Sequence, residues 1–196
     1  MASSRSLGPA STRWFIAGFA GVTGFLLLEA SLRRDGSASD LGASADDEGT
    51  TRQVAAASVA ALSGAPLLRR LPVRPLPAVC APIGLVGLLC GLLLRIWSMQ
   101  TLSDAYSRTL KVTQEQMTID RGPYRHVRHP GYLGSLLMWA GFALSSESPT
   151  VGAWVGALLL PAYARRMAAE ERLLERQLSG YGEYRARTKK LVPGVW

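Results

Sequence analysis

Cysteine, histidine and charged side chains are all scarce in this chain. Its 196 residues include two cysteines and two histidines, and 18% of them are charged whereas 48% are hydrophobic. This balance argues against both an ordinary soluble domain and a disordered chain. Cys80 and Cys90 lie in one apolar stretch, where a helix would hold them roughly 15 Å apart, too far for a disulfide. No CxxC pair or Cys/His cluster is present, so we predict no metal site.

The chain also lacks the short motifs of several soluble enzyme classes. It has no GxGxxG loop after a strand, no GxxxxGK[ST] loop, no HExxH pair and no GxSxG elbow. The sequence therefore offers no evidence for a soluble methyltransferase or dinucleotide fold, a P-loop enzyme, a zinc protease or an α/β-hydrolase.

What the chain has in abundance is apolar residues, gathered in long stretches that alternate with short basic segments. The alternation is typical of membrane proteins, in which each apolar stretch forms a helix. We therefore predict an all-α fold, a polytopic membrane helical bundle with about five transmembrane helices. The stretches are Trp14–Leu28, Val54–Leu68, Leu76–Leu94, Tyr132–Leu144 and Val151–Ala164.

The middle stretch gives the strongest signal for a membrane span. Extended to Trp97 it forms the segment Leu76–Trp97, which contains Gly87 and Gly91 in a GxxxG pattern. That pattern is typical of close helix packing. Val54–Leu68 is rich in alanine and short for a bilayer core of about 30 Å. The polar residues of Arg33–Arg52 have no periodicity and predict a loop.

The last two apolar stretches are separated by a short polar segment that ends in Pro149 and Thr150. Proline suits the first turn of a helix. The pair therefore predicts a tight transmembrane helical hairpin. Beyond it we expect a charged, cytoplasmic amphipathic helix over Ala164–Leu178, stopped by Gly180 and Gly182.

The net charge is +8, and the basic residues flank the apolar stretches. This is the pattern of a membrane protein, so we predict no nucleic-acid partner. With five spans and a cytoplasmic C-terminus, 17 of the 22 Lys and Arg residues fall on the cytoplasmic side. The positive-inside rule therefore predicts a multi-pass integral membrane protein with its C-terminus in the cytoplasm, in a bacterial inner membrane or the endoplasmic reticulum.

The densest group of chemically active residues lies between 121 and 134, where the chain reads RGPYRHVRHPGYLG. Polar groups at the mouth of an apolar helix tend to mark a functional site. An interfacial belt would explain the arginines and tyrosines, but not the fixed backbone that two Gly and Pro pairs demand. His126 and His129 could share a helical face as metal ligands, yet Pro130 breaks that helix and no third ligand is near.

A second constellation lies where the last apolar stretch meets polar sequence. Arg166 and Glu170 are four residues apart and share a helical face. Such pairs are common on solvated surfaces, but at this depth a charged pair can instead face a polar cavity.

At these two constellations the sequence resembles the isoprenylcysteine carboxyl methyltransferase family, within the wider group of membrane methyltransferases that includes phospholipid methyltransferases. The resemblance covers about residues 95–196. The residues that carry it are Gly122–Tyr124, Arg128–Tyr132 with Gly134, Arg166–Glu171, Tyr181–Tyr184 and Pro193–Trp196.

The apolar stretches predict about three N-terminal transmembrane helices in residues 1–97. The resemblance implies an S-adenosylmethionine-dependent methyltransferase whose donor-binding catalytic region is residues 98–196. It implies catalytic roles for Arg166 and Glu170, with Arg166 holding the substrate carboxylate. Gln116 stands where family members often have a histidine. The residues implied to contact the methyl donor are Gln116, Ile119, Tyr124, His129, Pro130, Gly131, Tyr132 and Glu170.

The acceptor implied by the resemblance is the carboxylate of an isoprenylated cysteine, in a lipophilic small molecule or a prenylated protein. A carboxylate with a pKa of roughly 4 is ionised at pH 7 and needs no general base. A phospholipid amine, a thiol or another lipophilic acceptor would need one, and Glu171 or His126 could serve. A non-enzymatic membrane scaffold or small transporter is the further alternative.

Overall fold

The computed structural model describes residues 8–32, 48–102 and 119–192. Over these residues the chain is helical and forms no strand, which confirms the predicted all-α class. In chain order the elements are α1 (Pro9–Leu32), α2 (Thr50–Leu68), α3 (Cys80–Leu102), the 3-10 turn η3 (Gly122–Arg125), α4 (Pro130–Ser145), α5 (Pro149–Gln177) and α6 (Tyr181–Arg187).

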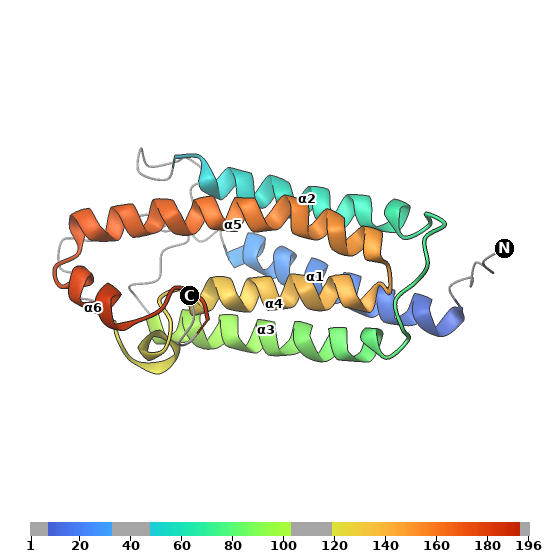
Figure 1. Cartoon of the computed structure of the whole chain (residues 1–196), viewed down its shortest axis with the longest axis horizontal. Coiled ribbons are helices and arrows are strands. Elements are labelled where there is room, and N and C mark those ends of the chain that lie inside the picture. Colours follow the sequence, from blue (N-terminus) through green and yellow to red (C-terminus); the bar gives the residue numbers. More distant parts are fainter. Residues whose placement is uncertain (1–7, 33–47, 103–118, 193–196) are drawn as a thin grey trace.

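The five long helices lie side by side along the longest axis of the molecule (Figure 1). The largest contacts pair α3 with α4 and α2 with α5, and α1 packs against both α3 and α4. The second half of α5, α6 and η3 lie together at one end, on the left in Figure 1. α4 contacts α1, α3 and α5, so it lies in the middle of the bundle. Its first turn lies at that same end (Figure 1).

The antiparallel helices α3 and α4 touch through their backbones at paired glycines. A Cβ atom added at Gly84 would lie 2.5 Å from the carbonyl oxygen of Gly141, and one added at Gly91 would lie 2.5 Å from that of Gly134. The glycines are seven residues apart on each helix, close to two turns, so each pair lines one face. The predicted close packing is confirmed at Gly91. Its partner along the seam is Gly84, because a Cβ atom at Gly87 would meet nothing nearer than 3.8 Å.

The predicted C-terminal hairpin is present. Pro149 occupies the first turn of α5, and the Ser148 side chain caps that turn by accepting from the backbone N–H of Val151. α5 runs without interruption through Ala164, so the charged segment is the second half of the same helix. Gly180, with a φ of 77°, lies between the end of α5 and Tyr181, the first residue of α6. The sequence analysis did not predict the helix α6.

Two predicted boundaries were wrong. α3 begins at Cys80, four residues after Leu76, because the prolines before it prevent a helix there. The Leu76 N–H instead donates to the carbonyl of Glu147, 2.8 Å away. The end of the predicted polar loop is also helical, since Thr50 already belongs to α2.

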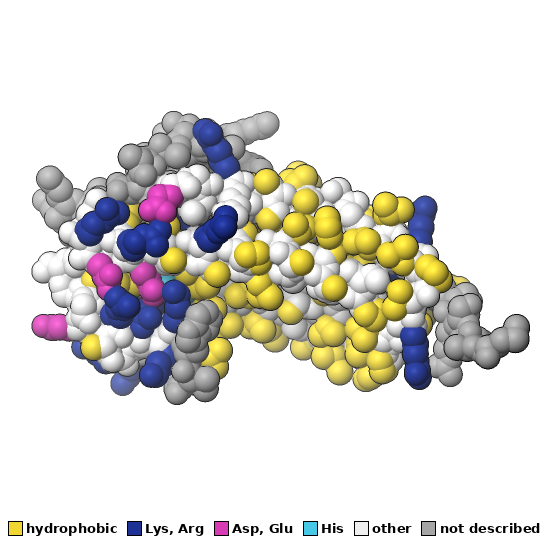
Figure 2. All heavy atoms as spheres, turned by 45° about the horizontal axis from the view of Figure 1, so that its top comes forward, with side chains coloured by type: hydrophobic (Ala, Val, Ile, Leu, Met, Phe, Trp, Pro, Cys, Tyr) yellow, Lys and Arg dark blue, Asp and Glu magenta, His cyan; other side chains and the backbone are white. Residues whose placement is uncertain are grey.

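On the face shown in Figure 2, apolar side chains cover the middle of the bundle and charged ones lie at both ends, most of them at the end formed by α5 and α6. On α3 the outward residues Ile83, Val86, Leu89 and Leu93 are 56–65% exposed. Among the described helices α3 is long and apolar enough to cross a membrane by length and composition. The count of five spans therefore stays a prediction.

The glycine seam yields a paired test. Gly91→Ala should destabilise the protein by about 1–3 kcal/mol, because its Cβ would overlap the α4 backbone. Gly87→Ala should be neutral or slightly stabilising, because its Cβ would make only an ordinary van der Waals contact with Gly141 and alanine favours a helix. Thermal unfolding in mild detergent, followed by circular dichroism, compares the two. Equal effects would contradict the assigned seam.

Candidate active site

The segment before α4 is fixed by the C-terminal tail. Val127 forms a parallel β-bridge with Lys189. The N–H of Arg128 donates to the carbonyl of Lys189 at 2.8 Å, and that of His129 donates to Lys190 at 3.1 Å. These bonds hold the backbone extended up to Pro130, which starts α4 and has no N–H to lose. The two motifs of the first constellation are thus separated by a defined turn, as their glycine and proline pairs suggested.

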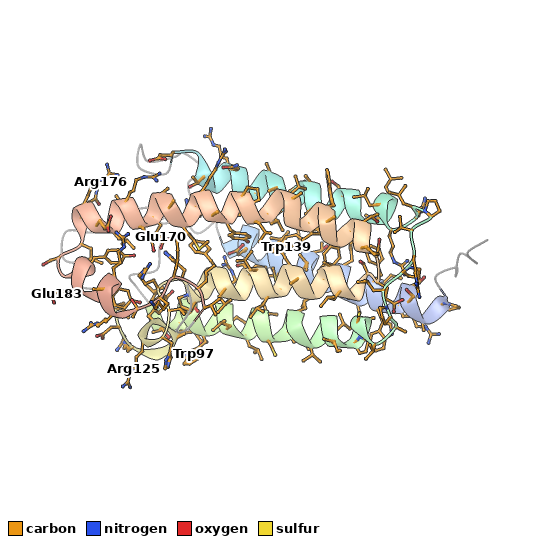
Figure 3. The ribbon with its side chains drawn as sticks, in the orientation of Figure 1. Trp97, Arg125, Trp139, Glu170, Arg176 and Glu183 are labelled. Carbon is orange, nitrogen blue, oxygen red and sulfur yellow. The ribbon has the colours of Figure 1, made fainter. Side chains whose placement is uncertain are left out.

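Tyr132 links the two predicted catalytic residues. Its hydroxyl donates to Oε2 of Glu170 at 2.6 Å and accepts from Nε of Arg166 at 3.1 Å. Arg166 and Glu170 lie one turn apart on α5, and Tyr132 reaches them from the first turn of α4. The structure therefore brings together three side chains that the sequence assigned to one site. Figure 3 shows Glu170 on the side of α5 that faces the bundle.

Arg166 is 5% exposed and is held from its other side by α2. Its terminal nitrogen NH1 donates to the hydroxyls of Thr50, at 3.0 Å, and Thr51, at 2.8 Å. Hydrogen bonds of this kind lower the cost of burying a guanidinium and fix the direction of its fork. The sequence analysis missed both threonines, because they fall in the stretch read as a loop. The change from polar to apolar residues at Val54 was the one sequence signal that a helix begins near these threonines.

Three basic side chains surround the carboxylate of Glu171. Arg128 Nε lies 3.0 Å and His129 Nε2 lies 3.1 Å from Oε1, and Lys190 Nζ lies 3.0 Å from Oε2. Burial acts to raise the pKa of Glu171, but the hydrogen bonds from His129, Lys190 and Arg128 outweigh it and hold the pKa far below its ordinary value. Glu171 is therefore a weak base and does not suit the base role considered for it.

The short helix α6 is anchored on η3. Tyr184 donates its hydroxyl proton to the carbonyl of Tyr124 at 2.7 Å. Burial raises the pKa of Tyr184 to about 12, so the donor keeps its proton at physiological pH. Arg128 adds a second link, because its NH1 donates to the carbonyls of Arg185 and Thr188.

The remaining predicted residues are placed as follows. The His129 ring is buried against Glu171, whereas His126 is exposed, so the two histidines do not share a face. Pro130 is buried, and Gly131, Tyr124 and Ile119 are half-buried. Gln116 lies outside the described residues. Within the described ranges no three His, Cys, Asp or Glu side chains gather as metal ligands.

Another buried charged group lies behind Tyr132. Arg95 of α3 forms an ion pair with Glu29 of α1. Its NH1 also donates to the Ser135 hydroxyl at 2.7 Å and to the carbonyl of Gly131 at 3.3 Å. Arg95 thus ties α1 and α3 to the first turn of α4. The sequence analysis gave it only the role of closing a span.

Comparison with known proteins places this geometry in a family. The model of the family described as phospholipid methyltransferase matches residues 79–180. The chain belongs to the phospholipid methyltransferase family. The match runs from the start of α3 to the glycine before α6, and it includes Tyr132, Arg166 and Glu170. It confirms the resemblance to the isoprenylcysteine carboxyl methyltransferase-like membrane enzymes.

One curated relative has a name that describes metal resistance and no enzyme activity. The nickel-cobalt-cadmium resistance protein NccN of Alcaligenes xylosoxydans xylosoxydans is 29% identical over 119 residues, which are 59% of this chain and 51% of that protein. The chain therefore spans about half the length of this relative. No solved structure matches.

The Glu171 cluster predicts a pH dependence. A carboxylate whose pKa is lowered on folding adds stability above its ordinary pKa of about 4.5, and this stability is lost as the pH falls below that value. The melting temperature of the wild type should therefore drop between pH 5 and about pH 3. Glu171→Gln should lower the free energy of unfolding at pH 7 by about 3 kcal/mol, and its melting temperature should fall accordingly. The variant should also lose this pH dependence.

The exposed Glu183, on the outer side of α6, supplies the matched control (Figure 3). Glu183→Gln should follow the wild-type curve. A Glu171→Gln variant that follows it as well would show that the three basic side chains do not stabilise the fold through this carboxylate.

Proposed function

We propose that this protein is an integral-membrane methyltransferase that transfers a methyl group from S-adenosylmethionine to the carboxylate of an isoprenylated cysteine. The family membership and the resemblance of the two constellations support the reaction class. The observation that carries the proposal is the partly buried linkage of Arg166, Tyr132 and Glu170, which joins α4 to α5 at the charged end of the bundle.

The side chains present suit a cationic methyl donor. Glu170 offers a carboxylate, a fitting partner for the ammonium group of S-adenosylmethionine. The rings of Tyr132 and Tyr163 lie 5.8 Å apart between their centroids and offer aromatic faces that attract a cation such as a sulfonium. When bound, S-adenosylmethionine supplies the methyl group on a sulfonium whose positive charge disperses during transfer.

Arg166 is proposed to bind the acceptor carboxylate. A guanidinium grips a carboxylate through two parallel hydrogen bonds, and its planar fork fixes the direction of the bound group. The bonds to Tyr132, Thr50 and Thr51 orient this fork before any substrate arrives. An acceptor carboxylate that binds with two parallel bonds would replace one of these partners. The acceptor is already ionised at neutral pH, so the protein's task is to align the reactants and exclude water.

The same arrangement supports a proposal for the orientation in the membrane. On the face shown in Figure 2, apolar side chains cover the middle of the bundle, and most Lys and Arg side chains lie at the end formed by α5 and α6. We propose a multi-pass protein with this end, and the C-terminus, in the cytoplasm. A lipophilic acceptor would then reach Arg166 from the bilayer with its head group at the interface.

A phospholipid amine is the second candidate acceptor, favoured by the description of the family itself. An amine must lose a proton before it attacks, so this reaction needs a base and should slow in mild acid. Glu171 is unsuited to that task because hydrogen bonds from His129, Lys190 and Arg128 hold its pKa far below the ordinary value. Carboxyl methylation should be flatter over the same pH range.

The assay supplies methyl-labelled S-adenosylmethionine and N-acetyl-S-farnesylcysteine to the purified protein in mild detergent. Base treatment releases labelled methanol from a methyl ester and not from a methylated amine or thioether. We expect volatile label with the wild type. Label confined to the phospholipid fraction would favour the amine acceptor. No transfer, together with no thermal stabilisation by S-adenosylhomocysteine, would contradict the methyltransferase proposal.

Arg166→Lys should lower the rate about 10- to 100-fold, because lysine keeps the charge but loses the fork. Arg165→Lys is the matched control, since Arg165 is the exposed neighbour on the same helix and should keep the wild-type rate. Equal rates for the two variants would remove Arg166 from its assigned role.

A further inference from the structure

Tyr181, the first residue of α6, has a buried hydroxyl that nothing described so far employs. The side chain is 3% exposed. Its hydroxyl oxygen has no hydrogen-bond partner among the residues that the structure describes. Its neighbour on the helix, Tyr184, has a similarly buried ring but a satisfied hydroxyl, which bonds to the Tyr124 carbonyl. The two tyrosines pack with ring centroids 5.9 Å apart, so they differ in partner rather than in burial.

A buried hydroxyl without a partner is costly, because it has given up its bonds to water. Proteins keep such groups rarely, and a ligand that supplies the missing partner is one reason to keep them. The position of Tyr181 fits that reason. It is the first residue of α6, which packs against α5. The charges of Glu171 and of Glu170, the proposed donor contact, act on its hydroxyl.

The same surroundings restrict what the hydroxyl can bind. Burial and the charges of Glu171 and Glu170 raise the pKa of Tyr181, so the hydroxyl stays protonated and acts as a donor. Arg128 acts on the hydroxyl in the opposite direction, but each of the two carboxylates has the larger effect, so a further negative group is disfavoured at this place. The acceptor atom is therefore expected to be neutral. In S-adenosylmethionine the neutral acceptors are the ribose hydroxyls and the adenine ring nitrogens, whereas the amino-acid end carries a carboxylate.

We infer that Tyr181 belongs to the methyl-donor site, where its hydroxyl donates a hydrogen bond to the nucleoside half of S-adenosylmethionine. This inference rests on the proposed function. It gives a role to α6, which packs against α5. It also implies that α6 recognises the nucleoside half of the donor.

Tyr181→Phe tests the inference, because it removes the hydroxyl and leaves the ring. The first readout is the melting temperature of the ligand-free protein in detergent. Tyr181→Phe should leave it unchanged or raise it, since no hydrogen bond is lost. Tyr184→Phe is the matched control and should lower it, because that hydroxyl has a partner. A drop with Tyr181→Phe as large as with Tyr184→Phe would overturn the inference.

The second readout is the dissociation constant, measured by calorimetry, for S-adenosylhomocysteine and for 5′-methylthioadenosine, which lacks the amino-acid end. Tyr181→Phe should weaken both about 3- to 10-fold, the range for one neutral hydrogen bond. Glu183→Gln, on the exposed side of α6, should bind as the wild type does.

The possible outcomes separate the two proposals. Wild-type affinity in Tyr181→Phe for both ligands would mean that water satisfies the hydroxyl, and a loss confined to S-adenosylhomocysteine would contradict a nucleoside contact. Either result would overturn the role of Tyr181 and leave the proposed function intact. A wild-type protein that binds neither ligand would contradict the proposed function itself, and the role of Tyr181 would fall with it.

Discussion

The backbone contact between α3 and α4 is the constraint on which the rest of the structure depends. Glycines at two levels of each helix remove the side chains that would hold the helices apart. The resulting close approach brings Arg95 within hydrogen-bond reach of the Gly131 carbonyl, where α4 begins. That places Tyr132 at a fixed height against α5. A wider spacing would separate Arg95 from α4 and leave an ion pair in the bundle with fewer bonds.

Charge compensation governs the polar end of the bundle. Glu171 is neutralised by Arg128, His129 and Lys190, and Arg166 is held by Tyr132 and by hydroxyls of α2. Unpaired charges at such depth would cost several kcal/mol each, so these contacts are conditions for the fold as well as for any chemistry. They also draw on four separate parts of the chain. The polar end is therefore assembled only when the whole bundle is.

In the proposed reaction, this arrangement would bring a charged methyl donor and a lipophilic acceptor together. The apolar flanks suit the bilayer, and the buried charged side chains Arg166 and Glu171 lie at the end formed by α5 and α6. There the side chains are oriented before ligands arrive, which is the main contribution that the protein would make to the proposed carboxyl methylation. The tail and α6 complete the same end and extend it toward the proposed nucleoside contact.

Local sequence patterns predicted much of the fold. The apolar stretches predicted the five long helices, Pro149 predicted the turn of the hairpin, and helical periodicity placed Arg166 and Glu170 on one face. These features depend on residues within a few positions of one another. The boundaries of α2 and α3 were missed, because capping and proline effects compete over single residues.

Long-range contacts decided the rest of the site. No spacing rule could bring Thr50 or Thr51 to Arg166, or Lys190 to Glu171, since helix packing and the path of the tail set these contacts. The glycine seam gives the same lesson, because GxxxG pointed to Gly87 while the facing helix selected Gly84. The sequence by itself determined which segments are helical and which residues share a helical face. The tertiary structure alone decided which buried polar groups meet, because a buried group's partner depends on how the helices pack.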